Sequence, residues 1–205
     1  MNYKSSAITP QLQVAGRAGL ILKHEAVILR APLIKDEKSP IGRDFRIVSI
    51  NDFPEAGYLS PPERSIRVRN MLDKAEKYRL EPHDLLLTIV GTIGKTAIIP
   101  ENMDTPWIPS SNMLIIRFRD DKWEKAITFL AFLKSNFGTR LLDTLTHGRT
   151  IPIVSKKEFS TTIIPAFDDD LIEKAISVFE QEITIAQDRQ QLADEIAAVR
   201  SAFLE

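Results

Sequence analysis

The glycine–lysine–threonine run at residues 94–96 is the first place in this chain where residue types could do chemistry. A lysine next to a glycine occurs in phosphate-binding loops, which need the pattern G-x-x-x-x-G-K-S/T. The residue five places before Gly94 is Ile89, not glycine, and T-A-I-I-P follows Gly94-Lys95. That is a strand pattern ending at a proline, whereas a phosphate loop opens a helix. We therefore interpret residues 85–100 as two buried strands joined by a tight turn. The turn would carry Gly91, Thr92, Gly94 and Lys95.

Other catalytic patterns are missing from the sequence. An amino-methyltransferase needs an Asn/Asp-Pro-Pro-aromatic motif, but the one Pro-Pro pair, Pro61-Pro62, lies between a serine and a glutamate. There is no G-x-G-x-x-G dinucleotide fingerprint. The chain has no cysteine, and its three histidines lie far apart in sequence without ligand spacing. We therefore expect no catalytic residue, no metal site and no cofactor held by this chain itself.

A short polar segment before an apolar strand has side chains suited to the edges of bases. Ser111 and Asn112 come directly before the apolar residues 113–118. An asparagine can form two hydrogen bonds to adenine, and a hydroxyl suits a base or a phosphate. The alternative is a capped turn that uses the same side chains for its own backbone.

A second polar segment lies in a glycine-containing loop before residues 151–154. It carries His147, Arg149 and Thr150, of which Arg149 is the strongest candidate because a loop arginine can reach guanine in the major groove. Lys156 and Lys157 follow. We expect these lysines to make phosphate contacts that are independent of sequence.

Three arginines lie close together in a third segment. Arg64, Arg67 and Arg69 surround the residues Ile66 and Val68. On a strand, Arg67 and Arg69 would share one face, and two guanidiniums on one surface suit phosphate groups. The alternative is an edge strand that is protected by charge.

Hydrophobic patterning predicts the elements that position these side chains. We expect strands at residues 26–29, 45–50, 113–118 and 151–154, with a short helix or arm at 71–80. Residues 123–145 have helical spacing with a break at Gly138, and we place Trp107 in the core.

The C-terminal segment predicts a long helix. Asp168, Asp169 and Asp170 suit a helix N-cap and first turn. Apolar residues then recur in alternating steps of four and three, which is typical of a coiled-coil seam with one polar member. We expect this seam to face a partner, because a small domain cannot cover a helix of this length. Its members are Ile172, Ile176, Phe179, Ile183, Ala186 and Gln190, followed by Ala193 and Ala197.

Charge is distributed unevenly along the chain. Residues 163–205 hold three basic and ten acidic residues, which leaves 24 basic and 18 acidic residues before them. A basic body with an acidic helical tail is typical of a nucleic-acid-binding protein with a protein-docking appendage. No apolar run approaches membrane-spanning length, and the N-terminus lacks a signal-peptide pattern. We expect a soluble, cytoplasmic protein without a membrane partner.

Six segments carry a resemblance to a known family. They are Glu81–Asp84, Leu85–Pro100, Ser110–Arg117, Phe129–Ser135, Gly148–Ser155 and Ile163–Pro165. In this order and spacing they resemble the target recognition domain of type I restriction-modification specificity subunits. The family pattern is proline or glycine, then Asp, an apolar strand, G-T-I-G-K, and another strand ending in proline. The resemblance covers the chain from about residue 45 to the C-terminus.

The resemblance implies a fold and a division of labour. It implies a mixed α+β fold, with a DNA target recognition domain at residues 1–166 and a spacer or dimerisation helix at 167–205. The chain would read one half of a bipartite site in double-stranded DNA. It would dock the methyltransferase and restriction subunits of a phage-defence complex, and only these partners would hold S-adenosylmethionine and ATP.

The chain departs from the family in length. A typical member has two recognition domains and two spacer helices, whereas this chain has one of each. The resemblance therefore implies a homodimer through the C-terminal helix, with the two helices antiparallel. The alternative is pairing with a different half-subunit.

Two other functions remain open from the sequence. In the first, the chain is a non-catalytic interaction or regulatory subunit that works through its helix, so any DNA binding would lack sequence preference. In the second, it is a small phosphotransferase that uses Lys95 and binds a nucleotide.

Overall fold

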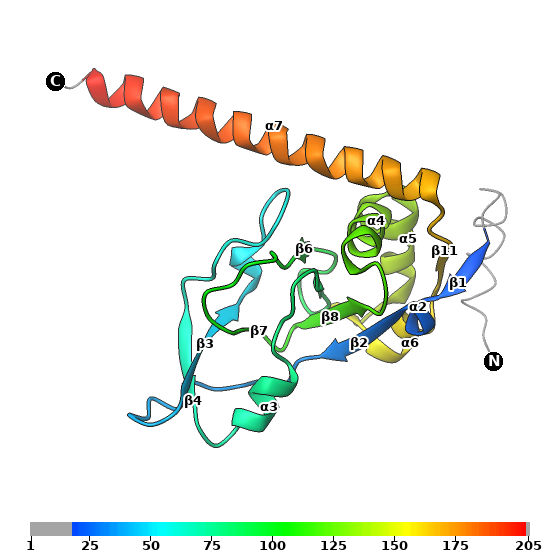
Figure 1. The fold of residues 1–205 in the computed structure, drawn as a ribbon, viewed down its shortest axis with the longest axis horizontal. Helices are drawn as coiled ribbons and strands as arrows, with labels where there is room; N and C mark the ends of the chain where they lie inside the picture. The colour runs from blue at the N-terminus through cyan, green and yellow to red at the C-terminus, as the bar shows by residue number, and fades with distance from the viewer. Residues whose placement is uncertain (1–17, 204–205) are drawn as a thin grey trace.

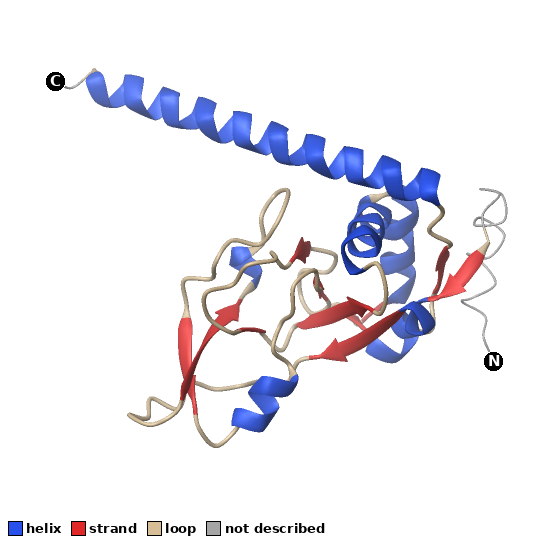
Figure 2. Ribbon diagram, viewed as in Figure 1, coloured by secondary structure: helices blue, strands red, loops and turns tan. Residues whose placement is uncertain are grey.

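The computed structural model describes residues 18–203, and residues 1–17 and 204–205 lie outside the described part. A four-stranded sheet, a three-stranded sheet, two short strand pairs and several helices form a globular body, and one long helix extends beyond it (Figures 1 and 2). This arrangement confirms the predicted mixed α+β fold with a long C-terminal helix.

The larger sheet has four antiparallel strands in the order β2-β8-β5-β6. The strands are β2 (Ala26–Arg30), β5 (Leu85–Thr88), β6 (Thr96–Ile98) and β8 (Met113–Phe118). Thr88 pairs with Met113 and Leu87 with Thr96, while Arg30 pairs with Leu114. This register places the ends of β2 and β5 and the beginnings of β6 and β8 at the same end of the sheet.

Both faces of this sheet are buried, which explains why most residues of β5 and β8 are apolar. One face packs on helices, through Leu85 and Leu87 among others. The other face, which includes Leu86 and Ile115, packs around Trp107. Trp107 is therefore a core residue, as predicted.

The smaller sheet has the order β4-β3-β7 and lies at the far end of the body from α5 and β11 (Figure 1). Its strands are β3 (Arg43–Val48), β4 (Ser65–Val68) and β7 (Trp107–Pro109). Strand β3 is antiparallel to β4 and parallel to β7. The short helices η1 (Ile50–Asp52) and α3 (Leu72–Lys77) belong to the connections around this sheet.

Helices α4 (Lys122–Lys134) and α5 (Asn136–Leu145) cover the helix-facing side of the larger sheet. The predicted break at Gly138 is wrong by three residues. The chain turns at Ser135, whose hydroxyl caps α5 by accepting a bond from the Gly138 N–H at 3.3 Å. Gly138 lies inside α5, where it allows close approach to the backbone of Phe132 and Leu133 at the end of α4.

Short elements complete the body. They are β1 (Gly19–Ile21), α2 (Leu22–Glu25), β9 (Thr146–His147), β10 (Ile153–Val154), α6 (Lys156–Ser160) and β11 (Ile163–Pro165). Strand β1 pairs with β11, and β9 pairs with β10, both antiparallel.

The last helix, α7 (Asp169–Ala202), crosses over α4 and then extends past the body (Figure 1). Asp168 caps it by accepting a bond from the Leu171 N–H at 2.9 Å. No helix within residues 18–203 is long and apolar enough to cross a membrane. The division of the chain into domains at residue 166 stays a prediction.

Candidate nucleic-acid interface

Three loops from distant parts of the sequence lie side by side at the end of the larger sheet where β2 and β5 end. Main-chain hydrogen bonds hold them together. The Ile89 N–H donates to the Asn112 carbonyl at 2.9 Å, and the Gly91 N–H donates to the Pro152 carbonyl at 3.0 Å. The Val154 N–H donates to the Ile89 carbonyl at 2.9 Å. The β5–β6 loop, the turn before β8 and the β9–β10 turn therefore form one continuous surface.

This surface, which we call the loop cluster, brings together half of the predicted DNA-binding residues. They are Thr92, Lys95, Ser111, Asn112, Arg149 and Thr150. All of these side chains are exposed except that of Ser111, which is half-buried. Their contacts with DNA stay a prediction, but the fold places them within one surface.

The β5–β6 loop is shaped by a buried threonine and two glycines. The Thr88 hydroxyl accepts a bond from the Lys95 N–H at 3.0 Å, and the Gly94 N–H donates to the Thr88 carbonyl at 3.1 Å. Gly91 and Gly94 have φ angles of +75° and +91°, which a side chain would strain. Lys95 is followed by strand β6 and not by a helix, so the loop lacks the geometry of a phosphate-binding loop.

A basic groove of about 610 Å³ adjoins the loop cluster. Its lining includes Arg30, His147, Lys156 and Lys157, and none of the lining residues within the described part of the chain is acidic. Both lysines are exposed, while His147 Nε2 lies 2.8 Å from a carboxylate oxygen of Glu158. Cations around a groove without acidic lining suit a phosphate backbone.

Two residues of this region were not expected from the sequence. Arg30 joins the groove because β2 ends beside β8 and α6 packs against β2, contacts that no local pattern predicts. Ile151 was assigned to a strand, but it lies in the β9–β10 turn and its side chain is 62% exposed. The turn position of Ile151 could have been predicted from its neighbours, because it directly follows Arg149 and Thr150 in a loop that contains a glycine.

The arginine group on β4 does not join the loop cluster or the groove lining. Arg67 donates two hydrogen bonds, of 2.6 and 2.7 Å, to the carboxylate of Asp44, and these bonds hold the pKa of Asp44 below its usual range. The Arg69 N–H donates to Glu37 at 3.0 Å. Because β4 is an edge strand whose central guanidinium is already paired, this geometry favours the charged-edge alternative. Phosphate contacts by Arg64, Arg67 and Arg69 stay a prediction.

A buried ion pair joins β8 to the segment before β5, outside the candidate site. Arg117 donates to Asp84 at 2.8 and 2.7 Å and to Glu81 at 2.5 Å. We assign this network to folding, since it ties β8 to the segment before β5. Among residues 18–203, no group of three His, Asp or Glu side chains is placed to hold a metal ion.

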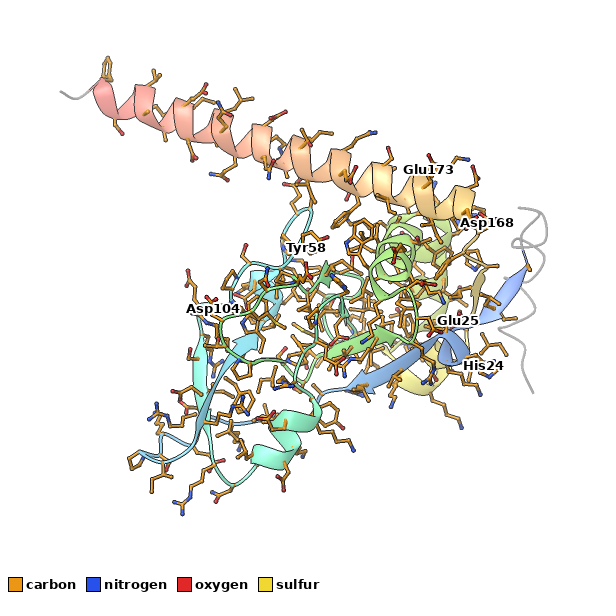
Figure 3. All side chains as sticks on the ribbon, in the orientation of Figure 1. His24, Glu25, Tyr58, Asp104, Asp168 and Glu173 are labelled. Atoms are coloured by element: carbon orange, nitrogen blue, oxygen red, sulfur yellow. The ribbon has the colours of Figure 1, made fainter. Side chains whose placement is uncertain are left out.

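The predicted partner-facing seam of α7 is wrong over its first half, because the body already covers it. Phe179 is buried and contacts the Tyr58 ring edge-to-face at 5.3 Å, beneath the helix in Figure 3. Ile176 and Ile183 pack against the same core, and Ile172 and Ala186 are half-buried. From Gln190 onward the predicted seam is exposed, and Gln190 donates to Asp194 at 2.8 Å.

A different apolar stripe remains exposed along α7. At 3.6 residues per turn it lies roughly 130° round the helix from the predicted seam. In Figure 3 the side chains at the C-terminal end of α7 project without other parts of the chain beside them. The members of this exposed stripe are Val178, Ile185, Leu192, Ile196, Val199 and Phe203.

Comparison with known proteins places these features in a wider context. Residues 34–192 match the family model for the type I restriction modification DNA specificity domain. No curated protein matches the sequence. The HsdS subunit from Thermoanaerobacter tengcongensis is similar in structure, with 13% identity and a TM-score of 0.55, over 92% of this chain and 46% of that one.

Two further solved structures are similar. One was described for complex assembly and conformational transition of the type I R-M system; it has 13% identity and a TM-score of 0.58, over 97% of this chain and 50% of that one. The type IIG restriction endonuclease BpuSI has 11% identity and a TM-score of 0.55, over 82% of this chain and 28% of that one. The chain thus spans about half the length of the first two structures and less of the third.

Proposed function

The chain belongs to the type I restriction modification DNA specificity family, and from that membership we propose that it reads one half of a bipartite site in duplex DNA. One observation carries this proposal. Three loops that are distant in sequence meet at one end of the larger sheet, beside a groove lined with cations. Such a surface combines groups for base edges with groups for phosphates, which is what sequence-specific binding needs.

The two parts of the surface would have different roles. In the loop cluster, Arg149 would contact guanine, and Asn112 would contact adenine, in the major groove. In the basic groove, Lys156, Lys157 and Arg30 would contact phosphates of any sequence.

The chemistry would belong to partner subunits. This chain would be non-catalytic and would dock a DNA methyltransferase and a restriction subunit, which would hold S-adenosylmethionine and ATP. The chain spans about half the length of the similar structures, so a second copy would complete the bipartite reader. The two copies would pair through the exposed stripe of α7, which shares no residue with the described lining of the groove.

The exposed stripe also favours a second candidate function. A helix with an apolar face beyond the body could make the chain an interaction or regulatory subunit of a defence complex. DNA binding would then depend on salt and not on sequence.

Methylome mapping separates the two candidates. The full chain is co-expressed with the adenine methyltransferase encoded nearest to it, and modified adenines are mapped across the host genome. A bipartite methylated motif supports specificity, and a palindromic motif supports two identical halves. An assembled complex that gives no methylated motif contradicts the proposal and favours the interaction subunit.

Two variants provide matched controls, with methylome mapping to read the motif and DNA-binding titrations at several salt concentrations to read the affinity. Arg149→Ala should relax the motif at one position, whereas Lys157→Ala should weaken binding to all sequences alike and lower the salt dependence by about one phosphate contact. If both variants change the motif in the same way, the assignment of Arg149 to a base is wrong.

A further inference from the structure

Ile151 is an exposed aliphatic side chain in the β9–β10 turn, which is one of the three loops of the loop cluster. Its side chain is 62% exposed, while Val154, three residues later, is fully buried. A single exposed apolar residue is ordinary on a protein surface. Ile151 differs because it directly follows Arg149 and Thr150, which are both exposed. In a turn that is proposed to face DNA, an exposed aliphatic side chain calls for an apolar group on the DNA that it could contact.

The backbone around Ile151 is held in place from both sides. His147 pairs with Ile153 across β9 and β10, so residues 148–152 form a closed turn. Gly148 has a φ angle of +93°, and a Cβ at this position would lie 2.4 Å from the Ile151 carbonyl oxygen. On the other side, the Pro152 carbonyl accepts a bond from the Gly91 N–H. The turn therefore presents Ile151 from a fixed backbone.

The side chain itself has little freedom to lose on binding. Branching at Cβ restricts the χ1 angle of isoleucine, so ordering it against a ligand costs less entropy than ordering a long flexible side chain. A rigid apolar group on a fixed turn is suited to one shape-specific contact. It offers no hydrogen bond to a phosphate or to a polar base edge.

In unmodified DNA, only one methyl group is available in the major groove. Thymine presents its C5 methyl there, whereas the other three bases present hydrogen-bond donors and acceptors. We infer that Ile151 is a specificity-determining residue that recognises a thymine by contact with its C5 methyl. This inference rests on the proposed function, because it requires that the loop cluster faces the major groove.

Removing the methyl group from DNA tests the inference directly. The full chain, in complex with its co-expressed methyltransferase, selects duplexes from a random pool that contains either thymidine or 2′-deoxyuridine. We expect the selected motif to lose its preference at one T·A position in the deoxyuridine pool. In a duplex with that single T→U change, affinity should fall about fourfold, the value expected for burial of one methyl group.

Two variants make the test specific to Ile151. Ile151→Ala should bind the thymine and uracil duplexes equally, because the contact is lost from both. Ile41→Ala is the matched control: Ile41 is 65% exposed but lies in the loop before β3. It should remain sensitive to the methyl group. Thermal unfolding of both variants should match that of the unchanged chain, since neither side chain is buried.

The outcomes separate this inference from the proposed function. If no pool yields a motif, the proposed function fails and the inference falls with it. If a motif appears but no thymine in it can be replaced by uracil with loss of affinity, only the inference is overturned. It is also overturned if Ile151→Ala keeps its sensitivity to the methyl group, or weakens methyltransferase binding without changing that sensitivity.

Discussion

Asp84 and Arg117 show how a single pair of residues fixes the frame behind the candidate site. The Asp84 side chain is fully buried and also accepts a bond from the Glu81 N–H at 2.8 Å. Burial raises the pKa of Asp84 above its usual value, and the Arg117 guanidinium opposes that rise. Because the pKa of Asp84 is higher in the folded chain, Asp84 binds a proton more tightly there than in the unfolded chain. Its contribution to stability is complete below the unfolded pKa and is lost as pH rises through the folded pKa.

Replacement of Arg117 by Met should make that pH dependence much steeper. The substitution leaves an uncompensated buried carboxylate, so the pKa of Asp84 should rise further and the free energy of unfolding at neutral pH should fall by about 3 kcal/mol. At pH 4.5 the carboxyl group can be neutral and the loss should be smaller. Urea unfolding at the two pH values measures this, with Arg119→Met as an exposed control. An equal loss at both pH values would contradict the assignment.

Residue types alone identified the candidate base-contacting residues of the loop cluster. They could not predict which residues become neighbours when the strands pair. Asn112 and Arg149 stand out because their side chains match base edges, a property that is visible in any sequence. Arg30 and the Asp44 partner of Arg67 do not stand out, because their roles depend on which strands become neighbours. Asp44 and Arg67 are directly opposed across β3 and β4, a register that is set by the whole sheet.

At the scale of elements, apolar runs were better guides than glycines. The predicted strand at residues 113–118 coincides with β8. Five of its six residues are apolar and buried, as a strand with two buried faces requires, and Arg117 is the exception. Strand β10 is shorter than the strand predicted at residues 151–154, because residues 148–152 form the turn between β9 and β10, and that turn is bonded to the β5–β6 loop. Gly138 was taken for a helix break, although its function is to let α5 approach α4.

Gly138→Ala tests that close approach. Helix propensity alone predicts that alanine would stabilise α5 by about 1 kcal/mol. A Cβ at this position would instead lie 2.1 Å from the Phe132 carbonyl oxygen and 2.5 Å from Leu133 Cα, both of them backbone atoms. We expect the free energy of unfolding to fall by about 2 kcal/mol, since α4 must shift. Urea denaturation gives the sign, and Arg140→Ala on the exposed side should have little effect; a stabilised Gly138→Ala chain would refute this packing.

At the scale of the whole molecule, α7 has two halves with different surroundings. The first half is fixed to the body by the Phe179 contacts and by a 2.6 Å ion pair between Lys134 and Glu182. Near its midpoint, Arg189 forms an ion pair with Glu55. The heptad pattern predicted a helix correctly, but it could not indicate which stripe the body would cover, since apolar residues occur on both sides of the helix.

Self-association through the exposed stripe predicts a clear effect of charge. Leu192→Asp combined with Val199→Asp should reduce the assembled mass from two copies to one, because two carboxylates would be buried in an apolar contact. The body should stay folded, since these side chains are 58% and 74% exposed. Sedimentation velocity measures the mass. Ile176 and Ile183 are unsuitable for this test because they pack on the body.

The matched control places the same two charges on another face of the helix. Gln191→Asp combined with Ala198→Asp changes exposed positions outside the stripe. This variant should keep the assembled mass. If both double variants dissociate, or neither does, the stripe is not the contact between copies.

The β9–β10 turn has a consequence for how this protein can change over time. The bonds that fix it to the β5–β6 loop run between main-chain atoms of Gly91, Pro152, Val154 and Ile89. These main-chain bonds do not depend on the side chains of residues 149–151, which are exposed. Substitutions at these three positions can therefore accumulate without loss of folding, and each could shift the preferred bases. If the turn reads DNA as proposed, chains with different residues at these positions would recognise different sequences on the same scaffold, and the positions could be diversified by design.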